Sequence, residues 1–397
     1  MKQEFLEILS VKTETKIVFL IIDGVGGVPV DGKTELEMAN KPNIDNLCKD
    51  SICGIMDPIA PGITPGSGPA HLALFGYDPL IYDIGRGLLS ALGIGFDLKE
   101  VDTCARGNFC TIEDGIIIDR RAGRISTEKN EGLCKILSEI KIEGIEVFVL
   151  PEKEHRFVVI FRGDDLSSDL SDSDPQVTGV PLSDVFPKTE DAKKTAEIVN
   201  QWISEVRKAL ASQYPANMVL LRGFANYLKI PSFLELYKLS SCCIATYPMY
   251  KGLAKLVGMD ILDCGETLED QIKILKENYP SYDFFFFHIK QTDKKGEDGD
   301  YEGKIKAIED VDKIIPDILS LSPDVFVITG DHSTPALLKA HSWHPVPLLI
   351  YSKYCIPDGI TKFSERDASK GSLGRFPMQN LMSISLAYAK KLMKFGA

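Results

Sequence analysis

Three short apolar segments that end abruptly in acidic residues constrain the fold of this chain most strongly. They are residues 16–22 before Asp23, residues 283–289 before Asp293, and residues 324–329 before Asp331 and His332. Uninterrupted apolar runs of this length are typical of strands buried on both faces of a mostly parallel sheet. Helical patterns at residues 42–49, 268–278 and 303–321 lie between them, and Pro316 should kink or split the last. The sequence therefore predicts an α/β domain.

The acidic strand ends are candidate members of a single site, because ligand sites in such sheets collect beyond the carboxyl ends of the strands. Asp331 and His332 are adjacent, and His341 follows nine residues later. Mixed carboxylate and imidazole ligands suit Mn²⁺ or Zn²⁺ better than Ca²⁺. The alternative is that each Asp caps the next helix and each His is only hydrogen-bonded. Repetition of the pattern at three strand ends favours a metal site.

The chain has 397 residues, which exceeds the roughly 250–300 residues that a single core usually supports. We therefore expect two domains. The middle of the chain has β-like runs at residues 115–118 and 157–161 and a helical pattern at 190–210. We place an inserted, smaller α+β domain at residues 98–240, with the α/β domain built from residues 1–97 and 241–397. Within the insert, the acidic stretch 164–175 lacks the Gly and final Glu of an EF-hand and is predicted to be a solvated loop.

The composition excludes several classes of partner. A net charge of −12 argues against binding to nucleic acid or to an anionic membrane. The apolar run at residues 17–22 is too short for a signal peptide or a membrane span. Nine cysteines without a CxxC pair are typical of buried thiols in a reducing compartment. We expect a cytoplasmic protein; the sequence leaves its oligomeric state open.

A glycine-rich turn at residues 61–71 offers a candidate nucleophile. Gly66 and Gly68 flank Ser67, and an apolar helical pattern follows. Such a turn lets the backbone approach an anion at a helix N-terminus, and coordination by a metal could activate the serine hydroxyl. The alternative is an ordinary turn that happens to contain a serine.

Arginines are clustered in one stretch of the chain. Seven of the eleven lie between residues 86 and 162. Guanidinium groups bind carboxylate and phosphate in a bidentate manner, so the cluster is compatible with an anion pocket. Surface ion pairs with the abundant acidic residues explain it equally well.

Taken together, these segments resemble the archaeal type of 2,3-bisphosphoglycerate-independent phosphoglycerate mutase, in the alkaline phosphatase superfamily. The resemblance spans nearly the whole chain and is carried by motifs at residues 22–26, 64–72, 75–79, 85–87, 91–95, 106–109, 119–124, 247–252 and 329–333. It implies an alkaline phosphatase-like, mostly parallel sheet flanked by helices. It also implies interconversion of 3- and 2-phosphoglycerate in glycolysis and gluconeogenesis without added 2,3-bisphosphoglycerate.

The resemblance further implies two divalent ions, Mn²⁺ first, with Zn²⁺, Co²⁺ or Mg²⁺ as alternatives. One group of ligands would be Asp23, Ser67, Asp331 and His332. The other would be Asp293, His341 and the residue four positions after Asp293. That position is often His in the wider family but is Glu297 here. Carboxylate can replace imidazole at Mn²⁺, but the change leaves the metal preference open.

The implied mechanism is attack of Ser67 on the substrate phosphorus, with Lys251 stabilising the developing charge, followed by return of the phosphoryl group to the other hydroxyl. Candidate substrate-binding residues are Arg106, Arg120, Arg121, Arg124, His155, Arg156 and Arg222. The same core would also serve a metal-dependent phosphomonoesterase or another phosphomutase. A non-catalytic sugar-phosphate or metal-binding regulator is the alternative from a different class.

Overall fold

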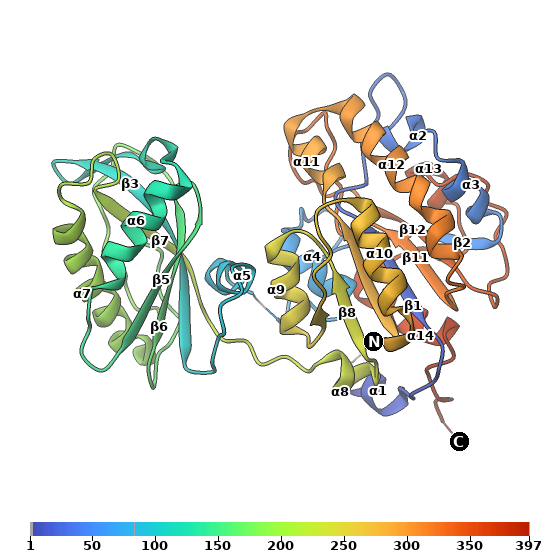
Figure 1. Cartoon of the computed structure of the whole chain (residues 1–397), viewed down its shortest axis with the longest axis horizontal. Coiled ribbons are helices and arrows are strands. Elements are labelled where there is room, and N and C mark those ends of the chain that lie inside the picture. The colour runs from blue at the N-terminus through green and yellow to red at the C-terminus, as the bar shows by residue number, and fades with distance from the viewer. Residues whose placement is uncertain (1–2, 83, 397) are drawn as a thin grey trace. The chain divides into compact units, whose positions relative to one another are not determined.

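The computed structural model describes residues 3–82 and 84–396, and the chain forms two compact units (Figure 1). Residues 1–83 and 230–397 make up the first unit, and residues 84–229 make up the second. The second unit thus starts and ends earlier than the expected insert at 98–240. Helix α5 (Arg86–Gly93) lies within it because Ala91 packs against Cys104 and Val158.

A large sheet organises the first unit. Within the described residues it has eight strands, and every neighbouring pair is parallel except β11–β12 and β12–β2. In spatial order the strands are β13 (Gly374–Pro377), β2 (Ser51–Asp57), β12 (Val346–Tyr351), β11 (Val325–Thr329), β1 (Ile17–Ile22), β10 (Phe284–Ile289), β8 (Ser241–Ile244) and β9 (Asp260–Ile261). The three acid-terminated apolar segments form β1, β10 and β11, and every residue of these strands is buried.

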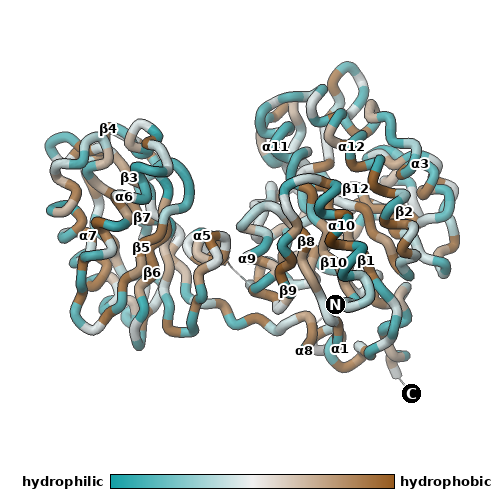
Figure 2. Tube along the Cα trace, in the orientation of Figure 1, coloured by the Kyte–Doolittle hydropathy of each residue, from teal (hydrophilic) through white to brown (hydrophobic). Residues whose placement is uncertain are grey.

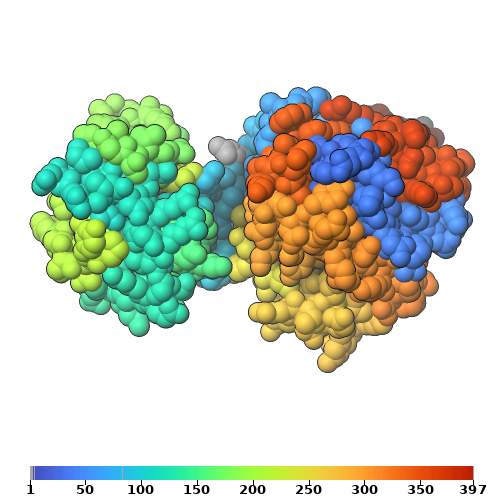
Figure 3. Space-filling view, turned by 90° about the horizontal axis from the view of Figure 1, so that it is seen from above, coloured from blue at the N-terminus to red at the C-terminus, as the bar shows by residue number. Residues whose placement is uncertain are grey.

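Helices cover both faces of this sheet, which explains why its central strands are apolar without alternation. They are α1 (Gln3–Leu9), α2 (Glu35–Met38), α3 (Pro42–Cys48), α4 (Ser67–Leu74), α8 (Phe233–Tyr237), α9 (Pro248–Leu256), α10 (Leu268–Asn278), α11 (Gln291–Asp298), α12 (Tyr301–Leu319), α13 (Glu365–Ala368) and α14 (Leu381–Tyr388). The predicted mostly parallel α/β fold is confirmed. In Figure 3, N-terminal (blue) and C-terminal (orange and red) segments lie side by side on the surface of this unit.

Helix α12 continues through Pro316 and is not split there, contrary to one of the two outcomes expected from the sequence. A proline removes the backbone N–H that would bond to the carbonyl four residues earlier. That carbonyl, on Asp312, accepts a hydrogen bond of 3.1 Å from the side-chain amide of Asn43. A tertiary contact therefore satisfies the carbonyl freed by the proline.

The second unit is an α+β structure built on an antiparallel sheet. The long strand β3 (Asp102–Glu113) pairs with β4 (Ile116–Asp119), β6 (Arg156–Arg162) and β7 (Met218–Asn226), and β5 (Glu146–Lys153) pairs with β6. Alternate residues of these strands face opposite sides of the sheet. One face packs with α6 (Thr127–Ser138) and α7 (Lys193–Leu210) around the buried Trp202, and the other packs with α5.

Hydrophobic residues are concentrated along the strands of both sheets (Figure 2). The acidic stretch at residues 164–175 is not wholly solvated as predicted. Ser173 and Asp174 are buried, and Asp174 forms a bidentate ion pair with Arg120. Among residues 3–82 and 84–396, no helix is both long enough and apolar enough to span a membrane.

Candidate metal and phosphoryl-transfer site

The carboxyl ends of three adjacent strands bring the predicted acidic residues together. β1 lies between β10 and β11, with Ile22 paired to Ile289 and Ile21 paired to Thr329. Asp23 directly follows β1, Asp293 lies in the first turn of α11, and Asp331 follows β11. All three carboxylates are fully buried. The parallel register therefore concentrates negative charge at one edge of the sheet.

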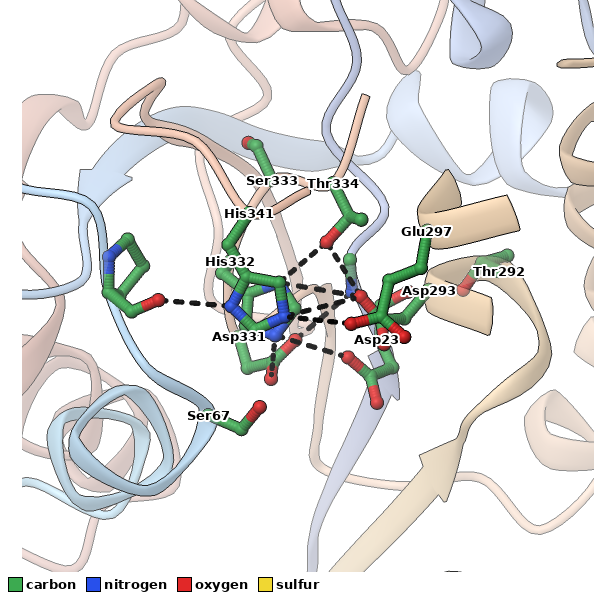
Figure 4. A network of polar contacts seen from close by, with 12 residues as sticks. Asp23, Ser67, Thr292, Asp293, Glu297, Asp331, His332, Ser333, Thr334 and His341 are labelled. Atoms are coloured by element: carbon green, nitrogen blue, oxygen red, sulfur yellow. Dashed lines mark hydrogen bonds and ion pairs between the residues drawn. The ribbon is translucent and has the colours of Figure 1, made fainter. Parts of the chain in front are cut away.

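Asp23, Asp331 and His332 form the first candidate cation group (Figure 4). The Nε2 atom of His332 lies 3.5 Å from Oδ1 of Asp23 and 3.0 Å from Oδ2 of Asp331. These three atoms are buried and have no hydrogen-bond partner among the described residues. Orphaned buried polar atoms are costly, and a bound cation would satisfy them. The donor set therefore fits a divalent ion.

The second candidate group consists of Asp293, His332 and His341. Nε2 of His341 lies 3.6 Å from Oδ1 of Asp293, while its Nδ1 contacts the carbonyl of Pro65 at 3.0 Å. A ring whose Nδ1–H donates to a carbonyl presents a free Nε2 for coordination. Glu297 Oε1 lies 3.9 Å from the same Nε2, and its side chain is 54% exposed. Glu297 is thus beside this group but at its solvent side.

Protons and cations compete for the ligand atoms of such a site. Burial, reinforced by Asp331, raises the pKa of Asp23 well above its usual value. Burial also favours a neutral His332, yet Asp331, Asp23 and Asp293 outweigh it and raise the pKa of His332 to about 9. Burial and the neighbouring His332 lower the pKa of His341. The protonation of each of these residues therefore depends on the charge of its neighbours in the cluster.

Ser67 begins helix α4, with Gly66 as its N-cap residue. Figure 4 shows its hydroxyl directed toward the Asp331–His332 side of the cluster. His71 lies one turn later and is fully buried, with its Nδ1 2.8 Å from the carbonyl of Ser67 and 3.4 Å from Oδ2 of Asp331. The backbone amides at the start of α4 offer hydrogen-bond donors for an anion beside Ser67.

Two further residues of the site were not singled out from the sequence. The ammonium of Lys290 forms ion pairs with Asp23 and Asp293, and the hydroxyl of Tyr250 donates a 2.7 Å hydrogen bond to Asp23. Lys290 follows the apolar run of β10 and lies only three residues before Asp293. This position beside a strand-end carboxylate is the sequence signal that could have identified Lys290 as a site residue. Lys251, which was expected to act at this site, lies half-buried on α9. Burial raises the pKa of the Cys243 and Cys264 thiols, and the positive charge of Lys251 partly offsets this effect.

In the second unit, several of the predicted substrate-binding residues gather on the face of the sheet that carries α5. Arg106 and Arg222 are paired across β3 and β7, and Arg156 extends from β6 opposite Asn108. Mutual repulsion among these guanidinium groups contributes to the lowered pKa of Arg106, after burial. Burial, together with Arg156, lowers the pKa of the buried His155 to about 4, and Arg121 and Arg106 also contribute to this shift. Arg106 lies 3.6 Å from Glu152 and Arg222 lies 3.9 Å from Asp174, so the positive charge of this face is partly compensated.

The remaining arginines of the prediction are arranged differently. Arg120 is held by Asp174 through two hydrogen bonds of 2.8 and 2.7 Å, which occupy its fork. Arg124 lies exposed at a 3₁₀ turn, with φ of 51°. The guanidinium of Arg120 is thus paired within the second unit, and Arg124 lies at the surface of that unit.

Comparison with known proteins identifies relatives along the full length of the chain. A family model for 2,3-bisphosphoglycerate-independent phosphoglycerate mutase matches residues 48–217. A Thermotoga maritima protein described as a probable enzyme of this kind is 52% identical over 398 residues, which cover 100% of this chain and 99% of the relative. A Thermus thermophilus protein with the same description is 49% identical, with coverage of 99% and 98%.

Two solved structures share the fold. A Pyrococcus horikoshii protein has a TM-score of 0.83 and 31% identity, with coverage of 97% of this chain and 100% of that chain. A cofactor-independent phosphoglycerate mutase from Thermoplasma acidophilum has a TM-score of 0.77 and 31% identity, covering 94% of this chain and 100% of that chain. Fold and site together define an α/β enzyme whose buried carboxylates and imidazoles are suited to divalent metals. The chain belongs to the 2,3-bisphosphoglycerate-independent phosphoglycerate mutase family.

Proposed function

We propose that this protein interconverts 3-phosphoglycerate and 2-phosphoglycerate through a phosphoserine at Ser67. Family membership supports the reaction class. The observation that carries the mechanism is the set of orphaned atoms, Oδ1 of Asp23, Oδ2 of Asp331 and Nε2 of His332, next to the Ser67 end of α4. Buried polar atoms without hydrogen-bond partners lower stability unless a cation satisfies them, which supports a cation-dependent catalytic task for this set.

Two divalent ions, Mn²⁺ by preference, are proposed for the site. Asp23, Asp331, His332 and Ser67 would hold one, and Asp293, His341 and Glu297 would hold the other. When bound, the ions would lower the pKa of the serine hydroxyl and neutralise charge on the phosphoryl oxygens. The carboxylate-rich donor set, with Glu297 in place of an imidazole, supports a hard ion such as Mn²⁺ over Zn²⁺.

The chemistry then consists of two transfers of one phosphoryl group. Ser67 gives up its hydroxyl proton as its oxygen attacks the phosphorus of 3-phosphoglycerate, the bond from phosphorus to the 3-oxygen breaks, and that oxygen takes up a proton to become the 3-hydroxyl. The 2-hydroxyl, losing its proton, next attacks the phosphorus of phosphoserine and releases Ser67, whose oxygen takes a proton back. Backbone amides at the start of α4 stabilise charge on the transferring oxygens.

The second unit is proposed to bind the glycerate carboxylate and keep the intermediate from leaving. Arg106, Arg156 and Arg222, with His155 and Arg121 nearby, supply positive charge on one face of its sheet. Retention of glycerate matters because water could otherwise accept the phosphoryl group, and the enzyme would then be a phosphatase. The arginines therefore determine the outcome more than the rate of the first step.

One experiment tests the proposal directly. Purified protein loaded with Mn²⁺ is mixed briefly with 3-phosphoglycerate, quenched in acid, and examined by mass spectrometry and by assay of 2-phosphoglycerate. We expect phosphate on Ser67 and formation of 2-phosphoglycerate without added 2,3-bisphosphoglycerate. Release of free phosphate alone would instead identify a phosphomonoesterase, and a strict need for 2,3-bisphosphoglycerate would contradict the mechanism.

A further inference from the structure

Lys290 lies between the two candidate cation groups and contacts a carboxylate from each. Its Nζ atom lies 3.0 Å from Oδ2 of Asp23 and forms an ion pair with Oδ2 of Asp293. It also donates a 3.1 Å hydrogen bond to the hydroxyl of Tyr250, which itself donates to Oδ2 of Asp23. One ammonium group therefore joins the two halves of the site.

These contacts use Oδ2 of each carboxylate. Oδ1 of Asp23 has no hydrogen-bond partner among the described residues, whereas Oδ1 of Asp293 accepts a 2.6 Å hydrogen bond from the hydroxyl of Thr334. Oδ1 of Asp23 faces Nε2 of His332, and Oδ1 of Asp293 faces Nε2 of His341. Lys290 thus compensates negative charge at Oδ2 of one carboxylate in each cation group.

The position of Lys290 is itself well defined. Its side chain is only 22% exposed, and its Nζ lies 5.2 Å from the ring centroid of Tyr247 and 5.4 Å from that of Tyr250. Aromatic faces at this distance attract an ammonium group. Lys290 is therefore confined between the rings and the carboxylates, and it does not sample solvent freely.

The positive charge of Lys290 also balances the buried carboxylates of the cluster. Asp23, Asp293 and Asp331 are fully buried within one cluster, and like charges at this distance repel strongly when no cation is bound. In the described part of the chain, no other lysine or arginine forms an ion pair with any of the three. Lys290 is accordingly the lysine that pairs directly with these carboxylates, in addition to the titratable ring of His332.

We propose that Lys290 is the shared internal counter-ion of both cation groups. The proposal rests on the metal site of the proposed function. It has a thermodynamic consequence, because the ammonium group stabilises the carboxylates most when no divalent ion neutralises them. By linkage, Lys290 and divalent ions must weaken each other's interaction with the site.

The test compares metal-free wild type with Lys290→Met, Lys290→Arg and the control Lys295→Met. Lys295 lies on α11, pairs with Asp300 and is 39% exposed. Mn²⁺ alone is titrated by calorimetry, and the unfolding temperature is measured with and without saturating Mn²⁺. We expect Lys290→Met to lower the unfolding temperature more in metal-free than in Mn²⁺-saturated protein and to bind Mn²⁺ about tenfold more tightly. Lys290→Arg should restore both values toward wild type, and the control should change neither.

Unchanged or weaker Mn²⁺ binding by Lys290→Met would overturn the proposal, and so would an equal loss of stability in the two conditions. A variant that folds only in the presence of Mn²⁺ would support it as the extreme case. A variant that Mn²⁺ cannot rescue would count against it. If wild type itself binds no Mn²⁺, the metal site fails, which is a different result from a failure at Lys290 alone.

Discussion

The imidazole rings of His332 and His341 are stacked, with 3.6 Å between their centroids and 28° between their planes. A backbone hydrogen bond of 2.9 Å from Ser342 to Ser333 ties together the two loop segments that carry them. His332 belongs to both candidate cation groups, and His341 belongs to one. The stacked pair therefore connects the two groups. Replacing His332 would remove a ligand from both groups, whereas replacing His341 would remove a ligand from one.

Replacing His341 should remove one cation and leave the other. His341→Ala is expected to retain about one Mn²⁺ per chain after dialysis, because Asp23, Asp331 and His332 do not depend on it. Asp331→Asn should lose the complementary ion, held by the first group. Elemental analysis of the dialysed proteins gives the stoichiometry. Loss of both ions from His341→Ala would show that the groups are not separate.

Ser67→Ala should abolish turnover while leaving the cations bound. Loss of a nucleophile typically costs at least about 10³-fold in turnover, and the other ligands of the first group are untouched. Steady-state assay of 2-phosphoglycerate formation is paired with Mn²⁺ titration of the same protein. Ser320→Ala, at the exposed end of α12, is the control and should behave as wild type. Appreciable turnover in Ser67→Ala would exclude the phosphoserine route.

Binding of Mn²⁺ should release protons near neutral pH. The carboxylates around His332 raise its pKa to about 9 in the metal-free protein against burial, from an ordinary value of 6.5. The protonated ring thus stabilises the metal-free fold below pH 6.5, and this contribution is lost as the pH rises through about 9. A cation requires the neutral ring, so Mn²⁺ affinity and activity should fall in acid. Calorimetry in two buffers of different ionisation enthalpy measures the protons; a release of none would contradict this assignment.

Removing Arg106 should weaken substrate binding without affecting metal binding. Arg106→Ala is expected to raise KM for 3-phosphoglycerate about 10- to 100-fold, as typical for loss of a charged hydrogen bond. Arg207→Ala, on the solvent side of α7, is the matched control. Steady-state kinetics and Mn²⁺ titration separate the two effects. Unchanged KM in Arg106→Ala would place the glycerate elsewhere.

Glu297→His should shift the metal preference of the second group. Imidazole favours Zn²⁺ relative to Mn²⁺ more than a carboxylate does. Because the Glu297 side chain is 54% exposed, the substitution should be accommodated without loss of stability. Competition between Zn²⁺ and Mn²⁺, followed by elemental analysis, measures the preference. An unchanged ratio would show that Glu297 is not a ligand.

Local sequence was sufficient to predict the sheet and the acidic edge of the site. Strands that are buried on both faces must be apolar throughout, so β1, β10 and β11 are visible as uninterrupted runs, and Asp23 stands directly after one of them. Parallel pairing then brings their carboxyl ends to one edge. The outcome at Pro316 and at Asp174 could not be predicted in this way. Each depends on a partner far away in the sequence, Asn43 and Arg120 respectively.

The sequence by itself determined the fold class, the strand-end carboxylates and the family to which the chain belongs, because each is encoded in contiguous residues. Only the tertiary structure showed which side-chain ammonium group lies among the carboxylates. The motif at residues 247–252 predicts a catalytic role for Lys251, which stays a prediction. The packing of α9 against the sheet directs Tyr250 to Asp23, and Lys290, which lies outside that motif, pairs with the same carboxylate. The physical reason is that side-chain direction and charge pairing depend on contacts between elements, which a linear pattern does not contain.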